Sequence, residues 1–179
     1  MCRVVFETER LMMRRPSVED IDALAVHWGD PETMKYIGQA GEAWPREKVV
    51  DRINAAIERC DQHGMTFWTA VEKETNCIIG QGGLVPIEFK GSEIELGYRL
   101  GRAHWGKGYA TEIAIASAAY GFESLGLNRL IAVTYPENTG SRRVLTKTGF
   151  REVGESDLYY DCKTVLYELS KESFVGKGS

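Results

Sequence analysis

The sequence has few of the features that mark metal-binding, disulfide-bonded or membrane proteins. Its four cysteines, at positions 2, 60, 77 and 162, are far apart and form neither a Cys-x-x-Cys pair nor a complete zinc motif. No apolar stretch approaches the length of a signal core or a bilayer span, because charges follow residues 1–6 at once. We therefore expect a cytoplasmic protein with free thiols, no metal and no membrane partner.

Basic charge and repeated sequence are also scarce. The net charge is −4, and the adjacent arginine pairs at 14–15 and 142–143 give no broad basic surface for nucleic acid. No internal repeat or low-complexity segment is present. With 179 residues, 43% hydrophobic and 27% charged, the chain is expected to form one domain over residues 1–170, followed by a polar tail, 171–179, that frays.

The segment from His104 to Glu112 contains glycine and other small residues between an expected strand and an expected helix. Glycines at 106 and 108 allow backbone N–H groups to turn toward one point, and the helix adds the positive end of its dipole. This combination predicts an anion site that suits a diphosphate. Lys107 either screens the phosphate charge or is a solvated loop residue.

Two common phosphate-binding loops are excluded. A Walker A loop requires Ser or Thr after its lysine, whereas Gly108 and Tyr109 follow Lys107. The dinucleotide fingerprint Gly-x-Gly-x-x-Gly requires a third glycine where Thr111 stands. The elements around the loop must therefore decide its interpretation.

Those elements follow a regular order. Apolar and polar residues alternate from 92 to 100, as in a half-buried strand, and a helical pattern follows the loop. Residues 129–135 have strand composition, and Asn138 is placed to cap a short helix that ends at Gly149. Residues 92–150 therefore predict the order strand, loop, helix, strand, helix, strand.

The rest of the chain supplies further elements. The expected strands are 8–15 at an edge of the sheet, 66–72 and 77–87 as a hairpin, and 160–169 as the last strand. The expected helices begin at a capping box that starts with Ser17, at Asp30-Pro31 and at Pro45. A mixed sheet with helices on both faces follows.

Two motifs resemble those of the GNAT acetyltransferase superfamily. Trp105-Gly-Lys-Gly-Tyr-Ala110 resembles its Q/R-x-x-G-x-G/A loop, and Asn138-x-x-Ser141 with Lys147-x-Gly149-Phe150 resembles its later N-x-x-A/S…K-x-G-F segment. Residues 7–16 are similar to the opening phrase of the ribosomal-protein N-terminal (alanine/serine) acetyltransferase branch. The match spans nearly the whole chain. It departs at Trp105, where many members carry Gln or Arg, and at Leu145, where many carry the tyrosine that protonates the departing thiolate.

The resemblance implies a fold and a co-substrate. The fold would be α/β (α+β), with a GNAT-like mixed, mostly antiparallel sheet of about seven strands and one splayed pair. The pantetheine arm of acetyl-CoA would enter between the strand that ends at Leu100 and the strand 131–135, with the Leu100 backbone N–H polarising the thioester carbonyl. The residues implied for coenzyme binding are Leu100, Trp105, Gly106, Lys107, Gly108, Tyr109, Ala110, Thr111, Asn138, Ser141 and Arg142. Arg143 and Arg102 are further candidates for the 3′-phosphate.

The implied reaction is attack of a neutral amine on acetyl-CoA. Glu95, with Glu93 as the alternative, could accept the proton of the amine directly or through water, unless both are solvent-facing strand residues. Ser141 could donate a hydrogen bond and a proton to the leaving thiolate, or it could be a first-turn serine with no catalytic role. Asn138 is expected first of all to cap a helix and only secondly to contact the coenzyme. The simplest role of Glu112 is to interact with the dipole of the helix in whose first turn it lies.

The acceptor pocket is expected between the N-terminal helices and the last hairpin. Its candidate lining residues are Trp28, Tyr36, Trp44, Tyr159 and Tyr160, unless these aromatics belong to the core. The branch resemblance favours a protein N-terminal α-amine as acceptor. The alternatives are a small amine, such as a polyamine, aminoglycoside or metabolite, and a non-catalytic acyl-CoA-binding sensor. A homodimer is left open.

Overall fold

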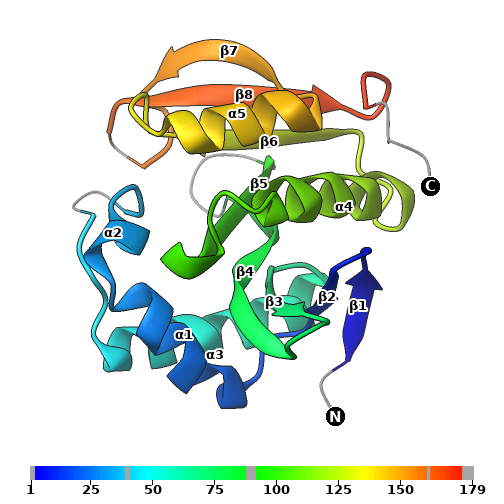
Figure 1. The fold of residues 1–179 in the computed structure, drawn as a ribbon. Helices are drawn as coiled ribbons and strands as arrows, with labels where there is room; N and C mark the ends of the chain where they lie inside the picture. Colours follow the sequence, from blue (N-terminus) through cyan, green and yellow to red (C-terminus); the bar gives the residue numbers. More distant parts are fainter. Residues whose placement is uncertain (1–2, 39–40, 88–91, 161, 175–179) are drawn as a thin grey trace.

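The structure is a computed structural model that describes residues 3–38, 41–87, 92–160 and 162–174. One sheet of eight strands runs through these residues in the order β1-β2-β3-β4-β5-β6-β8-β7 (Figure 1). The strands are β1 (Val4–Glu7), β2 (Leu11–Arg14), β3 (Phe67–Glu72), β4 (Cys77–Pro86), β5 (Ile94–Leu100), β6 (Arg129–Thr134), β7 (Arg151–Ser156) and β8 (Thr164–Ser170). The α-helices are α1 (Ile21–Trp28), α2 (Pro31–Met34), α3 (Arg46–His63), α4 (Tyr109–Glu123) and α5 (Thr139–Thr148), and two 3-10 turns are η1 (Val18–Asp20) and η2 (Arg102–His104).

The sheet is antiparallel at every neighbouring pair except β5 and β6, which run parallel. These two strands pair at one register position, Glu95 with Ile131. Beyond that position β5 continues to Leu100 and β6 continues to Thr134 without pairing each other. The expected mixed, mostly antiparallel sheet is confirmed, and the parallel pair opens into a gap toward the C-terminal ends of both strands.

Helices cover both faces of the sheet. α4 packs on β4 and β5, and its Ile113 and Ala118 share a core with Leu96 and Leu100 of β5. α1 and α3 pack together around Trp28 in a second core, which also contains Leu24, Met34, Val49 and Ile53. Figure 1 shows α4 and α5 as neighbours, apart from the group formed by α1, α2 and α3. In the described ranges, no helix combines the length and the apolar composition that crossing a membrane requires.

The N-terminal strands differ from the expectation. The expected single edge strand over residues 8–15 is wrong: Leu11–Arg14 forms β2, which lies between β1 and β3, and Val4–Glu7 forms the edge strand. Alternation of apolar residues reports which face is buried, and Leu11 and Met13 are indeed fully buried. It does not report whether another strand pairs with the outer edge of the predicted one. Strand β1 does so, and the sheet therefore has eight strands instead of the expected seven.

The C-terminal segment follows β8 closely. The Lys171 N–H donates to the Asn128 carbonyl at 2.9 Å, and the Phe174 ring lies 5.3 Å from the Phe122 ring. Residues 171–174, which were expected to fray with the tail, are therefore held against the domain. The remaining tail residues, 175–179, lie outside the described residues.

Candidate active site

The glycine loop leads directly into the N-terminus of α4. Gly106 has a φ of +73° and Gly108, the N-cap of α4, has a φ of +83°, a left-handed conformation that favours glycine. No atom lies within 4 Å of the position of an added Cβ at Gly106, so the loop is open to solvent there. The first N–H groups of α4 have no intrahelical partner and point toward this open side. The loop can therefore receive an anion through its backbone.

Arg10, in the turn between β1 and β2, holds the loop against α4. Its Nη1 donates to the Lys107 carbonyl at 2.8 Å, and its Nε donates to Glu112 at 2.7 Å. Thr8 adds a hydrogen bond from Oγ1 to Glu112 at 2.5 Å. Glu112 thus binds Arg10 and Thr8 in addition to lying in the first turn of α4. The sequence analysis did not identify Arg10, although it lies within the opening phrase, residues 7–16.

Tyr109 points away from the open side of the loop. It is 7% exposed, its hydroxyl donates to Glu72, and the guanidinium of Arg10 lies 4.4 Å above its ring. Among the residues expected to bind coenzyme, Tyr109 can therefore contribute its backbone N–H but not its side chain. Ala110 and Thr111 follow in the same helical turn and are partly exposed.

The backbone of β5 has a free edge along the gap. Ile87 N–H donates to Glu93 O at 3.0 Å and Gly101 N–H donates to Ile79 O at 2.9 Å, which places hydrogen-bonded pairs at both ends of the β4–β5 ladder. Because these pairs recur every second residue, the odd-numbered residues of β5 bond to β4. The even-numbered residues, Tyr98 among them, direct their backbone groups to the other edge, from which β6 has diverged.

Trp105 occupies one position on that free edge. Its Nε1 donates to the Leu100 carbonyl at 2.8 Å, and its side chain is 48% exposed. The Leu100 N–H and the backbone groups of Tyr98 remain directed toward the gap. The predicted residues Leu100 and Trp105 are thus brought together beside the glycine loop.

Ser141 lies across the gap from β5. Asn138 caps α5 by accepting the Ser141 N–H at 3.1 Å, as expected from the sequence. The hydroxyl of Tyr98 lies 3.0 Å from Ser141 Oγ and 3.2 Å from the Ser141 carbonyl oxygen. Burial raises the pKa of Tyr98 above its usual value, so its phenol stays protonated. Leu145 is 1% exposed and lies in the core.

Glu95 is a buried carboxyl on the opposite side of β5. It is 7% exposed, and burial raises its pKa to about 7 although a hydrogen bond from the Tyr160 hydroxyl opposes the shift. Tyr160 has a φ of +67° and reaches Glu95 from the loop between β7 and β8. Glu93, the alternative base, instead forms an ion pair with Arg129 at 2.8 Å. The two glutamates therefore have different environments: Glu93 is ion-paired, and Glu95 is buried with a raised pKa.

The predicted acceptor-pocket aromatics fall into separate places. Trp28 is fully buried and meets Trp44 edge to face, with 5.7 Å between ring centroids. Tyr36 lies beyond α2, and its ring is 6.1 Å from that of Tyr135 at the end of β6. Tyr159 is 6% exposed and packs in the core with Ile87 and Ile131. Trp28 and Tyr159 are therefore core residues, whereas Tyr36 and Trp44 are partly exposed.

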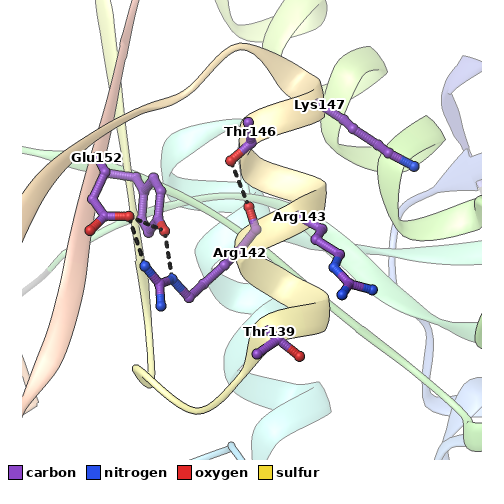
Figure 2. A pocket seen from close by; sticks show the side chains of 7 residues that line it. Thr139, Arg142, Arg143, Thr146, Lys147 and Glu152 are labelled. Atoms are coloured by element: carbon purple, nitrogen blue, oxygen red, sulfur yellow. Dashed lines mark hydrogen bonds and ion pairs between the residues drawn. The ribbon is translucent and has the colours of Figure 1, made fainter.

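The exposed face of α5 is hollowed and basic (Figure 2). A hollow of about 480 Å³ is lined by Thr139, Arg142, Arg143, Thr146, Lys147, Glu152 and Tyr167. Arg142 binds Glu152 and the Tyr167 hydroxyl, each at 3.0 Å, whereas Arg143 and Lys147 point to the other side of the helix in Figure 2. Arg143 has no hydrogen bond or ion pair with any described residue. Lys147 also borders a second hollow, of about 700 Å³, that Gly108 and Thr111 line.

Cysteine and acidic side chains build no further centre in the described ranges. Cys60, Cys77 and Cys162 are free thiols. Within the part of the chain that the structure places, no group of three or more histidine, cysteine or carboxylate side chains is arranged to hold a metal ion.

The model of the GNAT acetyltransferase domain matches residues 10–151. This chain belongs to the GNAT acetyltransferase family. The GNAT protein is similar to the N-acetyltransferase p20 of Bacillus licheniformis, with 34% identity over 174 residues that cover 94% of this chain and 97% of p20. It is similar to a solved GNAT-family acetyltransferase from Bacillus anthracis, with 27% identity, a TM-score of 0.79 and coverage of 93% and 98% of the two chains.

A third comparison concerns the fold alone. The solved ribosomal-protein-S5-alanine acetyltransferase from Vibrio fischeri is 22% identical to this GNAT protein, with a TM-score of 0.78 and coverage of 96% of this chain and 99% of that one. Together with the domain match, the relatives establish this protein as an acyltransferase of the acetyltransferase type. The domain implies acetyl-CoA as co-substrate.

Proposed function

We propose that this GNAT protein transfers an acetyl group from acetyl-CoA to a protein N-terminal α-amine in the gap between β5 and β6. The observation that carries the proposal is the free backbone edge of β5, which begins beside the glycine loop and runs past Ser141. An extended amide chain can pair with such an edge, as a peptide does when it adds to a sheet. Pantetheine is an extended chain of this kind.

The coenzyme would be held at three places. The N–H groups of the glycine loop and of the first turn of α4, from Gly106 to Thr111, would bind the diphosphate, assisted by the positive end of the helix dipole. Arg143 and Lys147, at the basic face of α5, are free to approach the 3′-phosphate, whereas Arg142 is engaged by Glu152. Leu100 N–H, at the free edge, would donate to the thioester carbonyl and stabilise the charge that develops on its oxygen.

The chain offers a group for each proton movement. Glu95, ionised above a pKa of about 7, would accept a proton from the ammonium form of the acceptor, directly or through water. The amine nitrogen then forms a bond to the acetyl carbon as the carbon–sulfur bond breaks. Ser141 Oγ would hydrogen-bond the departing sulfur and relay to it the second proton that the nitrogen releases, so that the serine ends neutral, and Tyr98, 3.0 Å away, would orient that hydroxyl. The products are an acetylated amine and a free thiol.

The base strength of Glu95 favours an α-amine. An α-amine has a reference pKa of about 7.7–8.0, close to that of Glu95, whereas a lysine side chain at about 10.4 would need a stronger base. The sequence resemblance of residues 7–16 to the ribosomal-protein branch supports the same class. A small-molecule amine remains the second candidate, and the negative net charge of the protein favours a cationic one such as a polyamine.

The test is thiol release from acetyl-CoA in the presence of four sets of amines, with the products identified by mass. The sets are short peptides with free N-termini, lysine peptides with blocked N-termini, polyamines and aminoglycosides. We expect a gain of one acetyl group on the free N-termini and its loss in Glu95→Gln. Acetylation of a small amine alone would replace the proposed acceptor. Coenzyme binding without acetylation of any amine would contradict transfer and favour a sensor.

A further inference from the structure

The guanidinium of Arg99, on β5, lies against the rings of Trp28 and Trp44, and we call these three side chains the corner. The guanidinium carbon lies 3.9 Å from the ring centroid of Trp28 and 4.5 Å from that of Trp44, and these two rings meet at 76°. Side chains alternate along a strand, so Arg99 shares its face of β5 with Glu95. Tyr98 and Leu100 face α4 instead. Arg99 therefore lies on the side of the gap from which the acceptor would approach Glu95.

The guanidinium has donors that no described residue uses. Its one hydrogen bond is a weak contact of 3.6 Å from Nη1 to the sulfur of Met34. Its Nε is buried without an acceptor. Among the described residues, no carboxylate lies within ion-pair distance of Arg99. A buried cation is normally paired, because removal from water is costly unless a partner replaces the lost hydration.

The charge of Arg99 persists near neutrality. Burial and the neighbouring charge of Arg52 lower its pKa to about 9, so the guanidinium still carries its proton at pH 7. The residue as a whole is only partly buried. The corner is thus a charged, partly desolvated site, and its guanidinium has no anionic partner among the described residues.

Two further cations surround the same ring. The Lys48 ammonium lies 4.8 Å and the Arg52 guanidinium 5.3 Å from the centroid of Trp44. Both are exposed residues of α3, and neither forms an ion pair with a described carboxylate. Three positive side chains therefore converge on Trp44 in a chain whose net charge is −4. Such a local field attracts an anionic group against the overall charge of the protein.

We propose that Arg99 binds a carboxylate carried by the same molecule as the reacting amine. This inference rests on the proposed function and names the class of acceptor that the site takes. The planar guanidinium offers parallel N–H groups that match a carboxylate in a bidentate arrangement. Trp44 forms the wall beside it, and Lys48 and Arg52 attract the anion from solution. The carboxylate comes either from an acidic side chain of a peptide or from a small amino acid.

The spacing along β5 sets the size of the acceptor. Glu95 and Arg99 are four residues apart, so their Cα atoms are separated by about 13 Å along the strand. A peptide rises about 3.3 Å per extended residue. An α-amine near Glu95 and a carboxylate near Arg99 therefore suit a peptide with an acidic residue within its first four positions, or a small acid with a flexible spacer.

The test compares carboxylates with matched carboxamides. Tetrapeptides with a free α-amine and an amidated C-terminus carry one Asp at position two, three or four, and each is paired with its Asn counterpart. 8-Aminooctanoate and 8-aminooctanamide, whose spacer approaches the separation of Glu95 and Arg99, form the small-molecule pair. For each pair, kcat/KM with acetyl-CoA is measured in the wild type, Arg99→Met, Arg99→Lys and Arg151→Met. Arg151 lies on β7 with a side chain that is 71% exposed, which makes it a matched control.

We expect at least one pair to favour the carboxylate by about ten- to a hundredfold, the range of a single charge-assisted hydrogen-bond contact. The ratio should fall to near one in Arg99→Met, persist in part in Arg99→Lys and remain in Arg151→Met. A purely structural role of Arg99 would change both members of a pair equally. Ratios near one in the wild type, or a ratio that survives in Arg99→Met, would overturn the inference.

The result separates this inference from the proposed function. Equal acetylation of both members of every pair would leave acetyl transfer intact and reject the carboxylate site. If no amine is acetylated, tryptophan fluorescence is titrated with the same pairs, because Trp28 and Trp44 both contact Arg99. A change that requires the carboxylate and is lost in Arg99→Met would support the site, and identical titrations would reject it. If Arg99→Met does not fold, the carboxylate-to-carboxamide ratios of the wild type and of Arg99→Lys test the inference instead.

Discussion

The hydroxyl of Tyr98 lies 3.0 Å from Oγ of Ser141, although Tyr98 belongs to β5 and Ser141 to the first turn of α5. This contact crosses the gap that opens where β5 and β6 diverge. Either hydroxyl can be the donor in this contact, and Tyr98 can also donate to the Ser141 carbonyl oxygen at 3.2 Å. The proposed role of Ser141 requires the arrangement in which Tyr98 donates to Ser141 Oγ, because the serine then keeps its own proton for the thioester sulfur.

Removal of either hydroxyl should slow turnover. We expect Ser141→Ala to lower kcat by about ten- to a hundredfold, because the departing thiolate loses a hydrogen bond to a charged group. Tyr98→Phe should lower kcat by less and leave coenzyme affinity unchanged. Since Tyr98 acts through Ser141, the double variant should be no slower than Ser141→Ala alone, as a double-mutant cycle of kcat would show. Full turnover of Ser141→Ala would remove the proposed role of the serine, and additive effects would separate the two residues.

The rate should depend on the ionisation of Glu95. Its pKa of about 7 in the free protein predicts that kcat/KM rises with pH through a limb near neutrality. Glu95→Gln should lose this limb together with most of the activity. Glu93→Gln should retain it, because Glu93 is paired with Arg129 at the surface. A pH profile of kcat/KM measures this, and an unchanged limb in Glu95→Gln would assign it to another group.

Glu95 should also make stability depend on pH. Its pKa is raised from 4.5 to about 7 in the folded state, so between these values the folded state binds more protons than the unfolded state. The contribution is therefore fully present below pH 4.5 and is lost as pH rises through 7, by about 3 kcal/mol in total. Denaturant unfolding at pH 5 and pH 8 should show this loss in the wild type but not in Glu95→Gln. An equal change in both proteins would contradict a buried, protonated Glu95.

Two glycines at opposite ends of α4 provide a matched pair for the coenzyme loop. Gly108 and Gly126 both have left-handed φ values, +83° and +67°, but only Gly108 borders the proposed diphosphate site. Gly108→Asp adds a negative side chain beside that site and should abolish acetyl-CoA binding in calorimetry. Gly126→Asp carries a similar backbone strain and should bind acetyl-CoA normally. Equal loss of binding in both variants would mean that strain, not phosphate repulsion, causes the effect.

Local sequence signals predicted the local parts of the site. The alternation over residues 92–100, the glycines at 106 and 108, and Asn138 as a cap all depend on neighbours within one element, and each is found where it was expected. The edge strand was wrong because periodicity records burial and not the number of paired strands. The motif resemblance added the splayed pair, which periodicity alone does not indicate.

The contacts that organise the site join residues far apart in sequence. Arg10 reaches Lys107 across 97 positions, and Tyr160 reaches Glu95 across 65. The alternation over residues 92–100 marks Tyr98 only as a member of a strand, because its partner Ser141 comes 43 residues later. Such pairings follow from the topology of the sheet, and the spacing of residues along the sequence does not indicate them.

The free edge of β5 is tested most directly by amide hydrogen exchange in isotope-labelled protein with and without acetyl-CoA. We expect the coenzyme to slow exchange of the Tyr98 and Leu100 N–H groups and to shift the resonances of Gly106 and Gly108, while Gly126 stays unchanged. This result would place the pantetheine arm in the gap between β5 and β6. Unchanged exchange at Tyr98 and Leu100, with the coenzyme demonstrably bound, would contradict the gap as the site of acetyl transfer.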